Sequence, residues 1–346
     1  KGARLILISH LGRPKGKVVS ELKMDKVAER LSEILGKKVI KLDTCVGDEV
    51  EQVVDKLKSG DVVLLENTRF YKEETENDVE FAKKLARLGD IFVNDAFGAA
   101  HRAHASTVGV AEFLLAVSGL LMAKELEMLD GILTNPASPF IAILGGAKVS
   151  DKIGVLKSLL GKCQEILIGG AMAYTFLRAE KIPTGRSLVE EDKVEEAKKI
   201  MEDAEKRGCR IHLPVDHVVA PEIASGVQIK IVGEKEIPSN YLALDIGPET
   251  IRLFNESIER AKTIFWNGPL GYFEIDEFAR GTGEIARKLA RVKAEVVVGG
   301  GDSISALKKD NLLDKMSHVS TGGGASLEFL EGKQLPGVAV LKDKKD

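Results

Sequence analysis

The chain has 346 residues, 44% of them hydrophobic, and a formal net charge of −3. Because a single hydrophobic core stops growing near ~250–300 residues, this length predicts two domains. Acidic and basic residues are interleaved, which excludes a polyelectrolyte tail or a basic stripe for a nucleic-acid backbone. No apolar run reaches the ~18 residues of a membrane span, so we expect neither nucleic acid nor a membrane as a partner.

The beginning of the chain and its cysteines give two further expectations. The sequence starts at Lys1 without Met and enters the apolar run 5–8 almost at once, as a chain cut inside a domain would. Cys45, Cys163 and Cys209 are far apart and odd in number, which favours neither a disulfide framework nor a cysteine metal pair. We therefore expect a cytoplasmic protein.

Short apolar runs alternate with amphipathic stretches along the whole chain. Most runs are almost continuously apolar, as parallel strands covered on both faces are. The stretch 193–205 carries its apolar residues at helical spacing. This alternation predicts an α/β fold of two doubly wound parallel-sheet (Rossmann-like) domains. Strands are expected at residues 5–9, 38–42, 61–66, 90–93, 140–144, 165–168, 210–213, 263–266 and 295–298.

A helix near the middle of the chain is the predicted boundary between the domains. Met122, Leu126, Leu129 and Leu133 form one apolar stripe, and the helix-breaking segment 135–139 follows. A helix that joins two α/β domains is a natural hinge, and ligands commonly bind in the cleft that it spans.

Three segments in the first half place basic side chains after predicted strands. Arg13 lies in Ser9–Pro14, Arg69 in Glu66–Phe70, and Arg102 in Asn94–His104. The carboxyl ends of parallel strands are where open sheets bind ligands, and guanidinium groups pair with carboxylate and phosphate oxygens. Together they indicate a site for a phosphorylated carboxylic acid. Each segment alone also fits an ordinary loop with a solvated arginine or a structural histidine.

Glycine-rich turns follow the predicted strands of the second half. Gly145–Gly154 carries two lysines and an aspartate, a composition suited to phosphate because small residues let backbone N–H groups approach an anion. The Walker A pattern is absent, so a different scaffold must hold any nucleotide. Further glycine turns lie at 168–172, 267–274, 299–303 and 321–326.

Acidic residues beside these turns suit the rest of a nucleotide. Glu274 could accept hydrogen bonds from ribose hydroxyls, and Asp302 is placed to hold Mg²⁺ near phosphates. Asp151 competes for the metal role, although it equally fits an acidic residue at a helix N-terminus. His212, His217 and His318 lack the spacing of metal ligands, and we expect them to be structural.

In this combination and order, the segments resemble those of phosphoglycerate kinase from one end of the chain to the other. The resemblance implies phosphoryl transfer between 1,3-bisphosphoglycerate and ADP, giving 3-phosphoglycerate and Mg-ATP in glycolysis. It implies a glycerate-binding domain of residues 1–118 plus 331–346, a hinge helix at 119–134 and a nucleotide-binding domain at 135–330. The segments are 9–14, 66–70, 94–106, 145–152, 266–274, 299–303 and 320–326.

The resemblance also assigns roles to single residues. Lys148 matches the lysine that meets the transferring phosphoryl group, and Gly322, Gly323 and Gly324 resemble the helix entrance that cradles phosphate on closure. Asp302 falls near the metal. Substrate-binding positions are matched by Ser9, His10, Gly12, Arg13, Arg69, His101 and Arg102, and nucleotide-binding positions by Gly146, Ala147, Lys152, Gly169, Gly170, Glu274, Asp302 and Ser303.

One departure from the family pattern bears on activity. Members begin with a strand bearing Asp-Phe-Asn-Val-Pro and then an arginine that contacts the reacting phosphate, a region that does not occur between Lys1 and Asp346. If the chain begins at Lys1, we expect severely impaired catalysis, and the alternative is a nucleotide-binding fragment of the enzyme. If it continues upstream, we expect an active enzyme.

Two further expectations concern assembly and cofactor class. We expect a monomer. A nicotinamide-dependent dehydrogenase is a weaker hypothesis, because no G-x-G-x-x-G opens the first helix with an acidic residue ~20 positions later.

Overall fold

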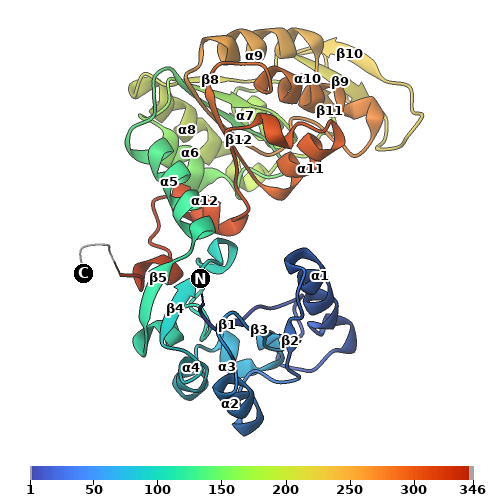
Figure 1. The fold of residues 1–346 in the computed structure, drawn as a ribbon. Helices are drawn as coiled ribbons and strands as arrows, with labels where there is room; N and C mark the ends of the chain where they lie inside the picture. The colour runs from blue at the N-terminus through green and yellow to red at the C-terminus, as the bar shows by residue number, and fades with distance from the viewer. Residues whose placement is uncertain (1, 343–346) are drawn as a thin grey trace. The chain divides into compact units, whose positions relative to one another are not determined.

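The computed structural model describes residues 2–342, and the chain forms two compact units. Unit 1 comprises Lys1–Ala123 and Gln334–Asp346, and unit 2 comprises Lys124–Lys333. Helix α5 (Leu120–Thr134) carries the chain from the first unit into the second (Figure 1). Across residues 2–342, no helix has both the length and the apolar character needed to cross a bilayer.

Unit 1 is built on short parallel strands. Strand β3 (Val62–Leu64) lies between β1 (Leu5–Leu7) and β2 (Ile40–Lys41). A separate parallel pair is formed by β4 (Ile91–Asn94) and β5 (Leu115–Ser118). Of these five strands, β1, β3 and β4 are followed by the arginine-bearing segments.

Helices cover both faces of the three-stranded sheet. Because successive side chains of a strand point to opposite faces, Val62 and Leu64 pack with helix α1 (Asp25–Leu35), whereas Val63 packs with helices on the other face. Those helices are α2 (Asp48–Asp55) and α4 (Val79–Ala86). The continuously apolar sequence of β3 follows from this two-sided burial.

The end of the chain returns to unit 1. Helix α13 (Pro336–Ala339) places the Gly337 N–H 2.8 Å from the carbonyl oxygen of Ala100, and the Asn94 amide donates to the Gly337 carbonyl at 3.0 Å. Lys1 and residues 343–346, which the predicted glycerate-binding domain includes, lie outside the described residues.

Unit 2 contains a six-stranded parallel sheet in the order β14-β13-β12-β6-β7-β8. The chain order runs outward from β6 to β8 on one side and from β12 to β14 on the other. The sheet therefore has its topological switch between β6 and β12, where doubly wound sheets bind ligands. The strands are β6 (Phe140–Leu144), β7 (Glu165–Ile168), β8 (Arg210–His212), β12 (Thr263–Asn267), β13 (Glu295–Gly299) and β14 (His318–Val319).

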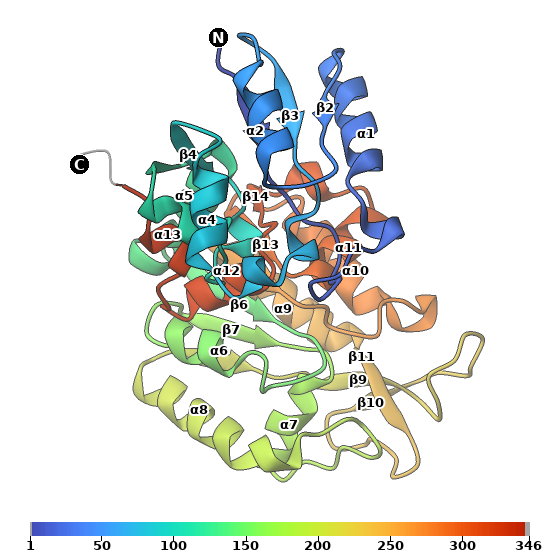
Figure 2. The same ribbon diagram turned by 90° about the horizontal axis from the view of Figure 1, so that it is seen from below.

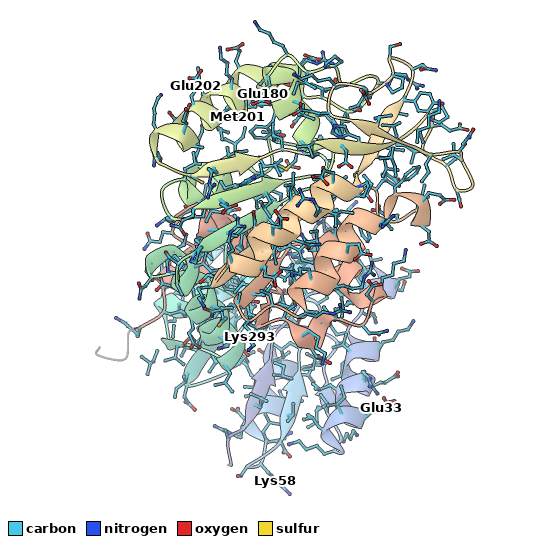
Figure 3. The ribbon with its side chains drawn as sticks, turned by 90° about the horizontal axis from the view of Figure 1, so that it is seen from above. Glu33, Lys58, Glu180, Met201, Glu202 and Lys293 are labelled. Carbon is cyan, nitrogen blue, oxygen red and sulfur yellow. The ribbon has the colours of Figure 1, made fainter. Side chains whose placement is uncertain are left out.

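Helices cover this sheet on both faces, with one group on each (Figures 1 and 2). On one face, the core includes Ile264 and Trp266 of β12 together with residues of α9 (Pro248–Arg260), α10 (Arg280–Leu289) and α11 (Gly301–Lys309). Charged side chains such as Glu202 point outward from the ribbon (Figure 3). The other group is α6 (Ile153–Leu159), α7 (Met172–Ala179), α8 (Val194–Lys206) and α12 (Gly324–Leu330).

A second sheet in unit 2 is antiparallel and was not among the predicted elements. Strand β9 (Asp216–Ala220) pairs with β10 (Lys230–Gly233) and β11 (Leu242–Ile246). The α/β prediction with doubly wound parallel sheets is confirmed, and each predicted strand is present, four of the nine shortened. The structure adds this antiparallel sheet together with β5 and β14.

Candidate active site

Three loops of unit 1 carry the basic side chains that sequence analysis singled out. Ser9, His10, Gly12 and Arg13 follow β1, Arg69 lies in a short 3-10 turn after β3, and His101 and Arg102 follow β4. The Thr68 N–H donates to the Ser9 carbonyl at 3.2 Å, which joins the first two loops. We call His10, Arg13, Arg69, His101, Arg102 and His104 the basic cluster.

Arg69 is held in place at its backbone and at one end of its guanidinium. Asn67 is fully buried, its side-chain amide donates to the Leu11 and Leu22 carbonyls at 2.8 and 2.9 Å, and its Oδ1 accepts from the Arg69 N–H at 3.1 Å. Arg69 Nη1 donates to the Gly12 carbonyl at 3.1 Å. Its buried Nε has no hydrogen-bond partner among residues 2–342. The guanidinium is therefore fixed in place, and its Nε–H can still donate to a ligand.

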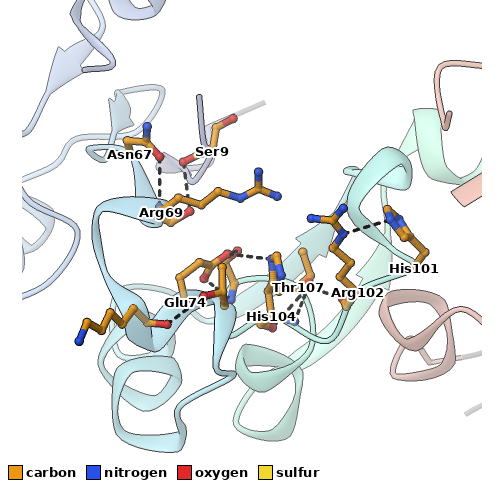
Figure 4. A network of polar contacts seen from close by, with 12 residues as sticks. Ser9, Asn67, Arg69, Glu74, His101, Arg102, His104 and Thr107 are labelled. Carbon is orange, nitrogen blue, oxygen red and sulfur yellow. Dashed lines mark hydrogen bonds and ion pairs between the residues drawn. The ribbon is translucent and has the colours of Figure 1, made fainter. Parts of the chain in front are cut away.

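The third loop brings a second arginine to the same place (Figure 4). Arg102 Nε donates to His101 Nε2 at 3.1 Å, which requires that this imidazole nitrogen be unprotonated. Thr107 Oγ1 lies 3.3 Å from both the Arg102 and the His104 carbonyls. Arg102 itself is exposed, so its guanidinium is open to a ligand.

The pKa values of the cluster report burial first and crowding of like charge second. Burial lowers the pKa of His10, and Arg69 and Arg102 lower it further. Burial, with the same two arginines, lowers the pKa of His104 to about 4. Burial and Arg102 also lower the pKa of Arg69. A bound anion would relieve this repulsion, so the cluster is suited to a phosphate or carboxylate.

In unit 2 the glycine loops meet at the topological switch. The Gly145 N–H donates to the Asn267 carbonyl at 3.0 Å, and the Gly146 N–H to the Pro269 carbonyl at 2.9 Å. The loop after β7 joins them through Gly170, whose φ is +67° and whose added Cβ would lie 2.6 Å from Gly146 N. Only glycine fits there, because both the φ and the backbone contact exclude a side chain.

A cavity of about 170 Å³ opens beside these loops. Tyr174, Ala243, Leu244 and Leu270 supply an apolar wall that suits the face of a purine base. A cavity of about 250 Å³ elsewhere in unit 2 is lined by Glu180 and other residues, none of them a glycine or a lysine, so it is the poorer match for a nucleotide. Of the predicted nucleotide residues, Gly146, Ala147, Gly170, Glu274 and Asp302 line the first cavity.

The two predicted lysines occupy different surroundings. Lys152 Nζ hydrogen-bonds Asn267 Oδ1, and burial lowers its pKa while Asp151 and Asp302 act to raise it. Lys148 is exposed in a loop fixed by Ser150, whose hydroxyl donates to Glu190 at 2.6 Å. Lys148 is therefore available to a ligand, whereas Lys152 braces the loop after β12.

Asp302 fits a magnesium ion held together with phosphates. It lies in the first turn of α11, is exposed at the cavity, and makes no hydrogen bond or ion pair with residues 2–342. The described residues contain no group of three or more histidine, cysteine, aspartate or glutamate side chains that could hold a metal. One free carboxylate suits Mg²⁺, which keeps several waters and takes its remaining ligands from substrate phosphates.

Other predicted residues support the site without lining the cavity. Ser303 is fully buried, and its hydroxyl accepts from the Gly268 N–H at 2.6 Å. Gly169 packs against Leu270: a Cβ added at Gly169 would lie 2.6 Å from Leu270 Cδ2. Gly322, Gly323 and Gly324 follow β14 and lead into α12, and they are not among the cavity residues.

Four residues that shape the two sites were not predicted from the sequence. Asn67 positions Arg69, and Glu190 fixes the lysine loop from 40 positions away. Tyr174 and Leu270 form the apolar wall. A polar residue directly after a buried strand was a signal for Asn67, whereas apolar wall residues look like ordinary core.

Comparisons with known proteins agree over nearly the whole chain. Residues 1–333 match the family model described as phosphoglycerate kinase. The phosphoglycerate kinase of Pelotomaculum thermopropionicum is 58% identical over 342 residues, which is 99% of this chain and 87% of that protein. That of Rubrobacter xylanophilus is 56% identical over 346 residues, 100% of this chain and 87% of that protein.

A solved structure shows the same fold. The phosphoglycerate kinase of Coxiella burnetii has a TM-score of 0.89 at 42% identity, and the match covers 98% of this chain and 86% of that one. These likenesses do not favour the alternative of a catalytically impaired nucleotide-binding fragment. The chain belongs to the phosphoglycerate kinase family.

Proposed function

We propose how this kinase divides the reaction of its family between its two units. The reaction is reversible phosphoryl transfer from 1,3-bisphosphoglycerate to ADP, giving 3-phosphoglycerate and ATP in glycolysis. The basic cluster of unit 1 binds the glycerate, and the cavity of unit 2 binds the nucleotide. The single observation that carries this division is the convergence of Arg69, Arg102 and His10, with Arg69 Nε left without a hydrogen-bond partner among the described residues.

In unit 1, the arginines supply charge and the loop backbones supply shape. Arg69 and Arg102 pair with phosphate and carboxylate oxygens, and Arg13 adds an exposed cation after β1. His10 donates while neutral, since its pKa is lowered. The proposed glycerate-binding residues are Ser9, His10, Gly12, Arg13, Arg69, His101 and Arg102.

In unit 2, the base lies against the apolar wall and the phosphates lie over the glycine loops. Glu274, exposed at the cavity, accepts from ribose hydroxyls. Asp302 would hold Mg²⁺, which when bound neutralises phosphate charge. Ser303 and Lys152 act indirectly, Ser303 by fixing the Gly268 N–H and Lys152 by bonding Asn267 Oδ1. The proposed nucleotide-binding residues are Gly146, Ala147, Lys152, Gly169, Gly170, Glu274, Asp302 and Ser303.

Phosphoryl transfer needs in-line placement and neutralisation of charge more than covalent chemistry. We assign Lys148 to the transferring group, because it is exposed and lies in the glycine-rich loop after β6. Gly322, Gly323 and Gly324 add backbone N–H donors at the start of α12. Because the two ligands must meet, we propose that the domains 1–118 with 331–346 and 135–330 close about the helix region 119–134, which excludes water from the acyl phosphate.

The last part of the proposal concerns the location of the protein, its oligomeric state and the class of its ligands. We propose a cytoplasmic monomer that acts on small molecules and binds neither nucleic acid nor membranes. All three cysteines are free thiols, in accord with a reducing compartment.

The division of labour is tested by paired binding measurements. Calorimetry should show that Arg69→Ala weakens 3-phosphoglycerate binding at least tenfold and leaves ADP binding unchanged. Gly146→Val should do the reverse, because a branched side chain at φ +110° distorts the phosphate loop. Loss of ADP affinity in Arg69→Ala would refute the division, and an assay coupled to ATP formation reports the complete reaction.

A further inference from the structure

Glu74 is a buried carboxylate directly beneath the basic cluster, and none of the proposed binding roles uses it. It lies in the short helix α3 (Lys72–Thr75), which follows the turn that carries Arg69, and it is 1% exposed (Figure 4). Charged side chains are almost never this buried unless they are paired. Its position therefore calls for an explanation.

Glu74 joins the arginine loop after β3 to the arginine loop after β4. Its Oε1 accepts from the Ser106 hydroxyl at 2.6 Å, and its Oε2 accepts from the Ser106 N–H at 3.0 Å. Its main-chain carbonyl accepts from the Ala105 N–H at 2.9 Å. One residue thus fixes the loop that bears Arg102 against the helix that continues from Arg69.

Glu74 also supplies the opposite charge that the cluster needs. Burial, Arg102 and Arg13 disfavour the charged form of Arg69, while Glu74 favours it. Glu74 Oε1 lies 3.7 Å from His104 Nδ1, but burial and the arginines lower the pKa of His104 to about 4, so this contact is not an ion pair at neutral pH. Burial raises the pKa of Glu74, while its hydrogen bonds to Ser106 and the charge of Arg69 act to lower it. The charge of Glu74 therefore acts on Arg69.

We propose that Glu74 is a positioning residue for the glycerate: it sets the spacing of Arg69 and Arg102 and stabilises the charge of Arg69 before the anion arrives. The inference rests on the proposed function of the basic cluster. Glu74 cannot contact the ligand itself, because it is buried and a carboxylate would repel a phosphate.

The obvious rival is that Glu74 only stabilises the fold. Glu74→Gln distinguishes the two, because glutamine keeps the shape but replaces one acceptor oxygen by a donor. The Ser106 hydroxyl and N–H both donate to this group, so at least one hydrogen bond must be rearranged. Glu76→Gln is the matched control, since Glu76 directly follows the same helix and is exposed.

The measurement is the dissociation constant for 3-phosphoglycerate and, separately, for ADP, by calorimetry, with thermal unfolding in parallel. For Glu74→Gln we expect about tenfold weaker 3-phosphoglycerate binding with ADP binding unchanged. Ser106→Ala removes one donor and should weaken 3-phosphoglycerate binding about threefold. In the double variant the losses should be less than multiplicative, because the two residues share one interaction. Glu76→Gln should match the unmodified chain.

Each contrary outcome has its own meaning. If Glu74→Gln lowers the unfolding temperature but binds 3-phosphoglycerate normally, the role is structural and the proposal is wrong. If Glu74→Gln does not fold, normal binding by Ser106→Ala overturns it. If the unmodified chain does not bind 3-phosphoglycerate, or if Arg69→Ala binds it as tightly as the unmodified chain does, the assignment of the basic cluster fails instead. If Arg69→Ala weakens binding while Glu74→Gln does not, the positioning role alone is refuted.

Discussion

Gly170 offers a sharp test of the nucleotide cavity, because the effect of its positive φ and the effect of its close packing can be measured separately. Its φ is +67°, and an added Cβ would lie 2.6 Å from Gly146 N, 2.7 Å from Gly146 O and 2.8 Å from Pro269 O. Backbone atoms cannot swing aside as a flexible side chain can. Gly170→Ala should therefore strain the loop that lines the cavity.

Gly208 provides the matched control. Its φ is +71°, it is exposed, and nothing lies within 4 Å of the added Cβ. Gly208→Ala should lower the free energy of unfolding by about 1–2 kcal/mol because of the left-handed backbone. The reduced freedom of the unfolded chain offsets about 0.4–1 kcal/mol of this loss. Gly170→Ala carries the same terms plus about 1–3 kcal/mol for overpacking.

The assay uses the single tryptophan of the chain. Trp266 is fully buried in β12, so its fluorescence during urea unfolding reports on unit 2. We expect the two variants to differ by about 1–3 kcal/mol in unfolding free energy, and only Gly170→Ala to lose ADP affinity. Equal stabilities, or normal ADP binding by Gly170→Ala, would refute the close-packed loop.

Three further predictions concern titration, transfer and metal. Burial lowers the pKa of His217 to about 4, below its unfolded value near 6.5. Its contribution to the free energy of unfolding is therefore present above pH 6.5 and lost as the pH falls toward 4. Urea unfolding of His217→Gln should show a flatter pH dependence of that free energy between pH 6.5 and 4, and an unchanged slope would contradict the prediction. Lys148→Ala should depress turnover far more than ADP affinity, and equal losses would remove its assigned role. Asp302→Asn should raise the Mg²⁺ concentration needed for half-maximal activity at least several-fold, and an unaltered requirement would place the ion elsewhere.

The parallel framework was predictable because its signal is strong and local. Runs such as Phe140–Leu144 are wholly buried, and burial on both faces demands continuous apolar sequence. The antiparallel sheet gave a weaker signal. Strand β9 begins with Asp216 and His217, yet both are buried: Asp216 accepts from Thr250, and His217 meets the Tyr174 hydroxyl at 3.4 Å. Partners so distant in sequence cannot be inferred from spacing.

The candidate sites were predictable where residue type alone sets the chemistry. Arginines and glycines that follow predicted strands indicated both groups of loops. His318, expected to be structural, lies 2.9 Å from Glu125. The residues that position others were not found. Glu74 looks like any charged residue of an acidic stretch, and only its burial against Ser106 separates it from its neighbours.

The central claim, that glycerate and nucleotide bind to separate units, is tested most directly by hydrogen–deuterium exchange with each ligand alone. We predict that 3-phosphoglycerate slows exchange in residues 9–13, 67–74 and 101–107, and that Mg-ADP slows it in residues 145–152, 169–172 and 267–274. Protection of the first set by Mg-ADP alone, or of the second set by 3-phosphoglycerate alone, would contradict the account.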